Sequence, residues 1–488
     1  MKKKLSKKAI EVINEIKKET GNSPDIIIKT IPYFNHYIYV IFNEMVSNRT
    51  TINDFILEYF ESDRKTPYKK DEIIKNIKAK LPVHKINIID NYDELLYLLL
   101  SGFTIILTDG NDQALAIETK EKLNSGIQES KAETIIKGPK DALTENYQTN
   151  IGLIRKKLKT ESLWLKEVTV GTRSKNKVGI MYINDIADID LVNYIVDKIK
   201  DIEIDSIPDS NYIMEMISEN KNNVFPDYIS TERPDLVSEH LLEGKIAIIV
   251  ENSQYAVIIP AVLIDFLHSP GDYYQKSINV NYTRIIRFLA IIITLLTPAI
   301  YIAITTHNHE AIPEKLLISF AAQRDGVPFP TIVEAMLMLI TFEILKESDL
   351  RIPQTLGSAL SIVGALVLGD AAVQAGIVSP IMVIVIAITA ITGLIVSYIE
   401  MIHGLRWWRI LFIIAAASLG IIGIFLISIF LIINLTSIKS FGIPYLSPIA
   451  PLNISNLNNS IFITRKRELL KRNVLTAKKN IYRSRGED

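Results

Sequence analysis

The sequence changes abruptly near residue 285, and this change limits the folds that are open to the chain. Lys, Glu, Asp and Asn are frequent before it, whereas long apolar runs with few charges follow it. A helix that crosses a bilayer needs about 20 mostly apolar residues. Four segments reach that length, one of them with polar exceptions: 285–306, 355–378, 380–402 and 408–434. We therefore expect a polytopic α-helical membrane domain over 281–455.

The number of crossings stays open. Segment 331–345 is shorter and carries Glu334 and Glu343, so a short span, a re-entrant segment and an interfacial helix all fit it, and the total is about four to six. Basic residues favour the cytoplasmic side, and the tail 456–488 is basic. Four crossings keep this tail beside the N-terminal region but place HGLRWWR outside. If 331–345 crosses, the tail needs another crossing near 441–455.

The preceding 280 residues are expected to form a cytoplasmic α+β region. The start is basic without an apolar core of signal-peptide length, so we expect no cleaved signal. Short runs rich in β-branched and aromatic residues, such as PDIIIKTI and HYIYVIF, predict strands. We expect two α/β subdomains, at 1–130 and 131–280.

An internal repeat supports two related subdomains. LLSGFTIILTDGNDQALAI begins at Leu99, and LLEGKIAIIVENSQYAVII begins at Leu241, so the two align without a gap, with Gly102 matching Gly244. Each copy predicts a helix that ends at Gly and then a β-hairpin, turning at 109–110 or 251–252. Chance similarity between two hairpins is the alternative.

The segment TERPDLVSEHLLEGK at 231–245 predicts the helix of the second copy. Thr231 can cap the helix N-terminus and Pro234 fits its first turn. Arg233 lies beside Glu232 and Asp235, which predicts an ion-pair cluster. Because this unit lies shortly before the first apolar run, we assign these residues and Gly244 to coupling or assembly.

Segment 355–378 has two distinct faces. Small residues recur every three or four positions, which allows close helix packing in lipid: Ser361, Ala365, Gly369, Ala372 and Gly376. The other face holds the pore-lining candidates Val363, Val367, Asp370 and Gln374. An Asp in a span usually faces protein or water, so this segment predicts a pore helix. The alternative is an Asp370 that is hydrogen-bonded inside a closed bundle or lies near the membrane surface.

Several chemistries find no support. Zero cysteines exclude disulfides and thiolate sites. Walker, GxSxG and HExxH motifs are absent, so we expect no enzyme, no cofactor and no metal. We expect a loop after a span, and not a metal site, at His307, His309 and Glu310. Segment 145–177 is basic with scattered aromatics, but a solvated helix explains it better than contact with nucleic acid or lipid head groups.

Several blocks, in order, resemble the A subunit of GerA-type spore germination receptors. They cover roughly 20 to 455 and include IKGPKDALTENYQTNIGLIRKKL, FPDYISTERPDLVSEHLLEGKIAIIV, PGDYYQKS, RDGVPFPTIVEAMLMLITFEILKESDLRIP, LSIVGALVLGDAAVQAGIVSP and SFGIPYLSP. Asp370 departs from the family, which often has an uncharged residue there, so the residues that line a pore stay open.

The resemblance implies a protein of the inner spore membrane that acts with a transporter-like B subunit and a lipoprotein C subunit. It implies nutrient-triggered release of monovalent cations through an oligomeric channel, with a pentamer suggested and with the nutrient pocket on the B subunit. A non-conducting scaffold that relays the signal is the alternative. A secondary transporter is disfavoured, because no inverted repeat is evident among the spans.

Overall fold

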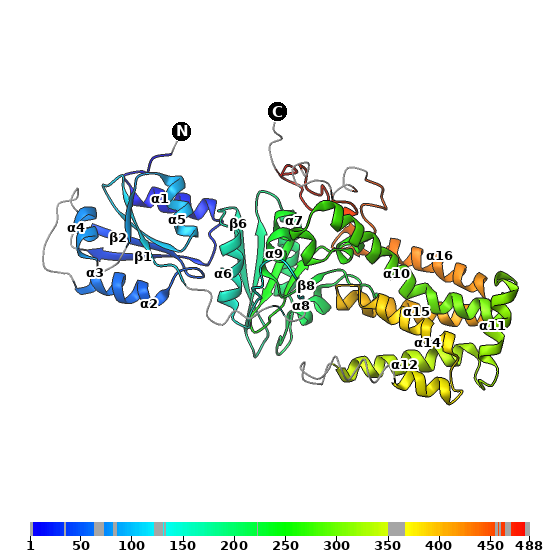
Figure 1. Ribbon diagram of the computed structural model, residues 1–488. Coiled ribbons are helices and arrows are strands. Elements are labelled where there is room, and N and C mark those ends of the chain that lie inside the picture. The colour runs from blue at the N-terminus through cyan, green and yellow to red at the C-terminus, as the bar shows by residue number, and fades with distance from the viewer. Residues whose placement is uncertain are drawn as a thin grey trace. The chain divides into compact units, whose positions relative to one another are not determined.

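The computed structural model describes residues 3–33, 36–62, 73–81, 85–121, 130, 133–221, 223–349, 367–453, 457, 460–463 and 470–483. The chain forms two compact units (Figure 1). The first contains Met1–Glu219, Tyr228–Pro260 and Arg467–Asp488, and the second contains Asn220–Asp227 and Ala261–Lys466. Residues 261–280 belong to the second of these units. Of the C-terminal tail, residues 467–488 belong to the first unit.

The first unit begins with a five-stranded antiparallel sheet in the order β1-β2-β4-β5-β3. Its elements in chain order are α1 (Ala9–Glu19), β1 (Ile26–Tyr33), β2 (His36–Asn43), α2 (Arg49–Ile52), a π-helical turn (Asn53–Leu57), α3 (Glu58–Ser62), α4 (Ile73–Lys80), β3 (Ile86–Ile89), α5 (Tyr92–Leu100), β4 (Phe103–Thr108) and β5 (Ala114–Glu118).

A second five-stranded antiparallel sheet follows in the order β6-β7-β9-β10-β8. Its elements are α6 (Tyr147–Lys157), β6 (Leu163–Val170), β7 (Asn176–Ile183), α7 (Ile189–Lys200), α8 (Ser210–Ile217), β8 (Ile229–Thr231), α9 (Pro234–Leu242), β9 (Ile246–Val250) and β10 (Ala256–Ile259). Strand for strand, this order repeats that of the first sheet.

The register of the two sheets also agrees. Ile41 of β2 pairs with Ile105 of β4, and the corresponding residues of the second sheet, Met181 and Ala247, pair in the same way. Both predicted hairpins are present, as β4–β5 and β9–β10. The turn after β9 places Asn252 at φ +68°, a conformation that Asn tolerates better than most side chains. The similarity therefore extends beyond the two hairpins, which argues against chance.

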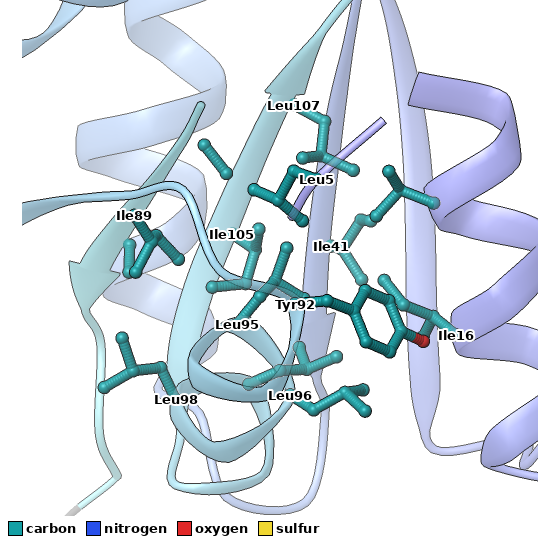
Figure 2. Packing of buried hydrophobic residues seen from close by; sticks show 14 of the residues in the cluster. Leu5, Ile16, Ile41, Ile89, Tyr92, Leu95, Leu96, Leu98, Ile105 and Leu107 are labelled. Atoms are coloured by element: carbon teal, nitrogen blue, oxygen red, sulfur yellow. The ribbon is translucent and has the colours of Figure 1, made fainter. Parts of the chain in front are cut away.

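One of the two hydrophobic cores of the first subdomain lies between its sheet and the helices α1 and α5. Figure 2 shows Tyr92 and Leu95 of α5 together with Ile41 and Ile105 of the sheet and Ile16 of α1. Ile16, Ile41, Leu95 and Ile105 are fully buried, at 0% exposure. Each such side chain contributes about 1.5–3 kcal/mol, so this face of the sheet is fixed against α5.

The two subdomains are joined by a buried ion pair. Arg155 of α6 pairs through Nε with Asp25, which directly precedes β1, and its Nη2 donates to the other carboxylate oxygen at 3.0 Å. Asn43 Nδ2 donates to Asp25 as well, at 2.8 Å. Arg155 is 2% and Asp25 0% exposed. Trp164 of β6 covers this junction and donates from Nε1 to the Glu19 carbonyl at 2.9 Å. The two subdomains are therefore held together by specific polar contacts.

The second unit is mainly helical. It contains η3 (Leu263–Leu267), η4 (Pro270–Tyr274), α10 (Ser277–Thr306), η5 (His309–Ala311), α11 (Glu314–Arg324), α12 (Thr331–Asp349), α14 (Pro380–Gly393), α15 (Ile399–Leu419), α16 (Ile421–Ser437), β11 (Lys439–Ser440) and β12 (Ile443–Pro444). Within the described ranges, α10 and α15 are long and apolar enough to cross a membrane, by length and composition alone, and α14 and α16 are shorter apolar helices.

Two of the expected spans are divided differently. Segment 380–402 is not one helix, because α14 ends at Gly393 and α15 begins at Ile399. Segment 408–434 breaks at Gly420, whose φ is +63°. There the amide of Ile421 is satisfied by Asn308 Oδ1 at 3.0 Å. The basic sequence around Arg406 therefore lies inside α15 and not in a loop.

Candidate functional site

Of the residues assigned to coupling, Glu232, Arg233, Pro234 and Asp235 form a buried cluster at the N-terminus of α9. Arg233 is 1% exposed. Its Nη2 donates to Asp235 Oδ2 at 2.9 Å and to the Pro139 carbonyl at 2.7 Å. Its Nη1 donates to the Glu133 carbonyl at 3.3 Å. The planar guanidinium reaches several acceptors at once, which a Lys ammonium cannot do in this geometry. Arg233 thus ties the connecting segment before α6 to the start of α9.

Carboxylates complete the same cluster. Glu232 Oε1 accepts from the Ser130 hydroxyl at 2.5 Å and from the Glu133 amide at 3.0 Å. In return, Glu133 Oε2 accepts from the Thr231 hydroxyl at 2.5 Å and from the Glu232 amide at 3.2 Å. The Leu143 amide donates to the Glu232 carbonyl at 2.6 Å. Segments about 100 residues apart along the chain are therefore bound reciprocally.

The pKa of Glu133 is raised to about 7. Burial is the largest cause, and the neighbouring Glu232 charge adds to it. Hydrogen bonds from Thr231 and from the Glu232 amide act against the shift, as does Arg233. The cluster therefore holds a carboxyl group that changes its protonation near neutral pH, whereas an ordinary Glu is ionised there.

The start of α9 differs from the sequence-based expectation in one respect. Arg233, not Thr231, occupies the N-cap position, and Pro234 lies in the first turn as predicted. The Thr231 hydroxyl cannot serve as the helix cap because it donates to Glu133 and accepts from the Arg233 amide at 3.1 Å. Gly244 follows the helix at φ +85°, and its counterpart Gly102 has φ +90°. Both positions use the left-handed conformation that glycine permits.

The expected pore segment is described only in part. Ser361, Val363 and Ala365 lie outside the described residues. The chain is helical over 367–374, and Gly376 lies beyond this helix in a turn with φ +69°. Gly376 is therefore not on the predicted packing face, because the backbone leaves the helix before it.

Within 367–374, the two predicted faces differ in exposure. Val367 is 60% exposed, and Asp370 and Gln374 are also exposed. Gln374 Nε2 donates to Asp370 Oδ2 at 2.7 Å. Gly369 is buried and Ala372 is half-buried, and a Cβ on Gly369 would lie 3.4 Å from Val383 of α14. Gly369 therefore lies against α14, and Asp370 and Gln374 are exposed.

Sequence reasoning missed a buried charge cluster before and within the first turns of α10. Arg287 forms two hydrogen bonds to the Asp272 carboxylate, at 2.8 and 2.9 Å, and Arg284 forms one at 3.2 Å. Asp272 is 3% exposed. Burial opposes its ionisation, but the bonds and charges of both arginines prevail and lower its pKa. The spacing of Arg284 and Arg287, three apart on one helix face, was the available signal.

Carboxylates of α12 were also left without assigned partners. Glu334 is 0% exposed and lies 3.5 Å from Arg324 Nη2, and it accepts from the Ser379 amide and hydroxyl at 2.9 Å each. Glu343 lies 2.9 Å from Arg406 and 3.4 Å from Arg409 of α15. Both glutamates therefore act as links between helices of the second unit.

Comparison with known proteins agrees with the family suggested by the sequence blocks. The model of the Bacillus/Clostridium GerA spore germination protein family matches residues 14–475. Spore germination protein KA of Bacillus subtilis (strain 168) is 38% identical over 460 residues, covering 92% of this chain and 83% of that protein. Spore germination protein A1 of the same organism is 33% identical over 427 residues, covering 87% of each.

A solved structure is similar to the N-terminal part of the chain. The crystal structure of the N-terminal domain of the A subunit of the Bacillus megaterium spore germinant receptor GerK3 is 28% identical, covering 54% of this chain and 98% of that one, with a TM-score of 0.41. The family match spans nearly the whole chain. This protein belongs to the GerA family of spore germination proteins.

Proposed function

We propose that this chain is the A subunit of a nutrient-responsive spore germination receptor, and that copies of it form a monovalent cation channel together with B and C subunits. It would lie in the inner membrane of the spore as a polytopic protein, with the large N-terminal region in the cytoplasm. Membership of the GerA family and the apolar helices α10 and α15 support this placement.

One observation carries the channel proposal. On the helix at 367–374, the exposed residues Val367, Asp370 and Gln374 share one face, since residues three and seven positions apart point the same way. Gly369, on the other side, packs toward α14. An exposed carboxylate on an apolar helix is costly in lipid and suits an aqueous path. In an oligomer, a ring of such carboxylates would attract cations.

The test is potassium release from nutrient-exposed spores that carry Asp370→Asn or Val367→Ala at equal protein levels. A carboxylate 5 Å from a cation in water contributes about 0.8 kcal/mol, which is about a fourfold change in local cation concentration. Asp370→Asn should slow release by about that factor, and Val367→Ala should change its rate or cause leak without nutrient. Ile429→Ala, an exposed position of α16, is the matched control.

Unchanged release in both variants would favour the second candidate, a non-conducting scaffold that assembles the receptor and relays the signal. A specific observation favours this alternative. Glu334 and Glu343 form ion pairs with Arg324, Arg406 and Arg409 that link helices of the second unit. Polar residues in the apolar region therefore also serve as structural links.

The coupling role of the α9 cluster is proposed separately. Arg233→Ala removes the hydrogen bonds to Asp235 and to the carbonyls of Pro139 and Glu133, and it empties the space of a side chain that is 1% exposed. We expect germination or receptor assembly to fall sharply. Arg173→Ala, at a side chain 83% exposed in the same subdomain, is the control. If Arg233→Ala left assembly and germination unchanged, the cluster would be structural only.

A further inference from the structure

The C-terminal tail contains a defined structural element. Residues 470–483, here called the strap, belong to the first unit. The strap folds back on itself, because the Arg472 amide donates to the Ile481 carbonyl at 2.7 Å and the Arg483 amide donates to the Leu470 carbonyl at 2.8 Å. Its sequence, LKRNVLTAKKNIYR, contains basic but no acidic side chains.

The middle of the strap is packed against the end of α9. Ala477 is 0% and Thr476 6% exposed. The Thr476 hydroxyl donates to the Glu243 carbonyl at 2.6 Å, and Arg472 Nε donates to the Leu242 carbonyl at 2.7 Å. A Cβ on Gly244 would lie 2.7 Å from the Thr476 carbonyl oxygen. Gly244 therefore has a second function besides its backbone conformation, since only glycine lets the strap backbone approach this closely.

The basic side chains of the strap form ion pairs and hydrogen bonds with carboxylate and carbonyl groups. Lys478 pairs with Asp188 at the N-terminus of α7, and Arg483 Nη2 lies 2.8 Å from Glu243 Oε1. Lys479 Nζ donates to the Asn184 carbonyl at 3.0 Å. Residues 184–188 and 242–244 form the surface that contacts the strap, and we call this surface the groove. The groove is thus complementary in charge to a basic segment.

The first subdomain shows what the strap replaces. There the chain continues past β5 to Lys120, which packs against Gly102. A Cβ on Gly102 would lie 3.2 Å from Lys120 Cγ. The Glu121 amide donates to the Val46 carbonyl at 2.9 Å. In the second subdomain, the position that corresponds to Val46 is Ile186, and its carbonyl accepts from the Lys479 amide at 3.5 Å.

The reason for this substitution lies in the path of the chain. After β10 the chain leaves the first unit at Pro260 and enters the second unit at Ala261. The stretch that would correspond to 119–121 is therefore used elsewhere, and the strap takes its place beside Gly244.

We propose that the groove formed by 184–188 and 242–244 is a binding site for a basic peptide that folds back on itself, and that the strap of the same copy is its ligand. The strap completes the second subdomain as 119–121 complete the first. This inference is independent of the proposed channel, because its evidence is a binding contact within the first unit.

Cross-linking of the full chain tests this contact. The native sequence has no cysteine, so the pair Asp188→Cys and Lys478→Cys is the sole target for a short bismaleimide. The control pair combines Lys478→Cys with Asp197→Cys, a 73% exposed position about 13 Å further along α7. We expect an intrachain product several-fold above the control. A yield equal to the control, or a product only between chains singly substituted at 188 and at 478, would overturn the proposal.

Peptide binding provides a second measurement. An added peptide of sequence LKRNVLTAKKNIYR should compete with the strap of the full chain and lower the cross-linking yield of the 188–478 cysteine pair, and a scrambled peptide should not. Gly244→Ala should weaken this binding about tenfold or more, because its Cβ meets strap backbone. Gly442→Ala, also at positive φ but with nothing within 4 Å, is the control for backbone strain alone. Equal binding by the Gly244→Ala and Gly442→Ala chains would refute the role of Gly244 as the floor of the groove.

Discussion

The pKa of Glu133 leads to a measurable pH dependence of the segment that it holds. Its pKa is about 7 in the folded chain, against an ordinary value of 4.5. Because the folded state binds the proton more tightly, the stabilisation is complete below pH 4.5 and is lost as the pH rises to about 7. A shift of this size corresponds to about 3 kcal/mol. The residue is half-buried, so we discount this to about 2 kcal/mol for solvent screening.

The perturbation is Glu133→Gln, which keeps an oxygen for the Thr231 hydroxyl and removes the ionisation. Above pH 7, the substituted segment should be more stable than the native one by up to about 2 kcal/mol. Well below pH 4.5 the difference should nearly vanish, because Glu133 is then protonated in both the folded and the unfolded state.

Hydrogen exchange of the full chain, corrected for the intrinsic rate at each pH, measures this difference. The informative amides lie in 133–143, including Leu143, which donates to the Glu232 carbonyl. Glu145→Gln, an exposed carboxylate of the same connecting segment, is the control. If protection of 133–143 has the same pH profile in the native and Glu133→Gln chains, the shifted pKa is refuted.

Two further predictions concern buried charges. Arg155→Leu leaves Asp25 buried without its cation and should destabilise the first unit by about 3–5 kcal/mol; denaturant unfolding followed by Trp164 fluorescence measures this, and a loss below about 1 kcal/mol would contradict it. Asp272→Asn should loosen the start of α10, because Arg284 and Arg287 lose their counter-ion. Since the pKa of Asp272 is lowered on folding, its stabilisation is present above the ordinary carboxyl pKa and is lost as the pH falls below it. Faster tryptic cleavage after Arg284 and Arg287 of the variant at neutral pH is the expected result, and equal cleavage of variant and native chain would refute it.

Local signals were sufficient for the repeated hairpins. The Leu-Leu-x-Gly ends of α5 and α9 and the turns after β4 and β9 depend on residues within a few positions. The strand order around each hairpin was not predicted, because pairs such as Ile41 with Ile105 join residues far apart in sequence.

Long-range contacts explain the errors. Thr231 suits an N-cap locally, but its hydroxyl is engaged by Glu133, 98 positions away. The break at Gly420 was missed because hydropathy averages over a window, whereas one glycine and the side chain of Asn308 decide it. From the sequence of the strap, only its basic character could be predicted. Its position could not, because the residues that it contacts lie about 230 to 290 positions earlier in the chain.

The return of the chain to the first unit has a consequence for biosynthesis. The second subdomain lacks its last element until 470–483 have been made, although β10 ends at Ile259. At about 5–20 residues per second, the intervening stretch takes roughly 10–40 s to translate. During that time the ribosome synthesises all of the apolar helices, and the acidic groove beside Gly244 is not yet covered by the strap. Folding of the first unit is therefore ordered after synthesis of the second, and a nascent chain arrested before residue 470 would expose that groove.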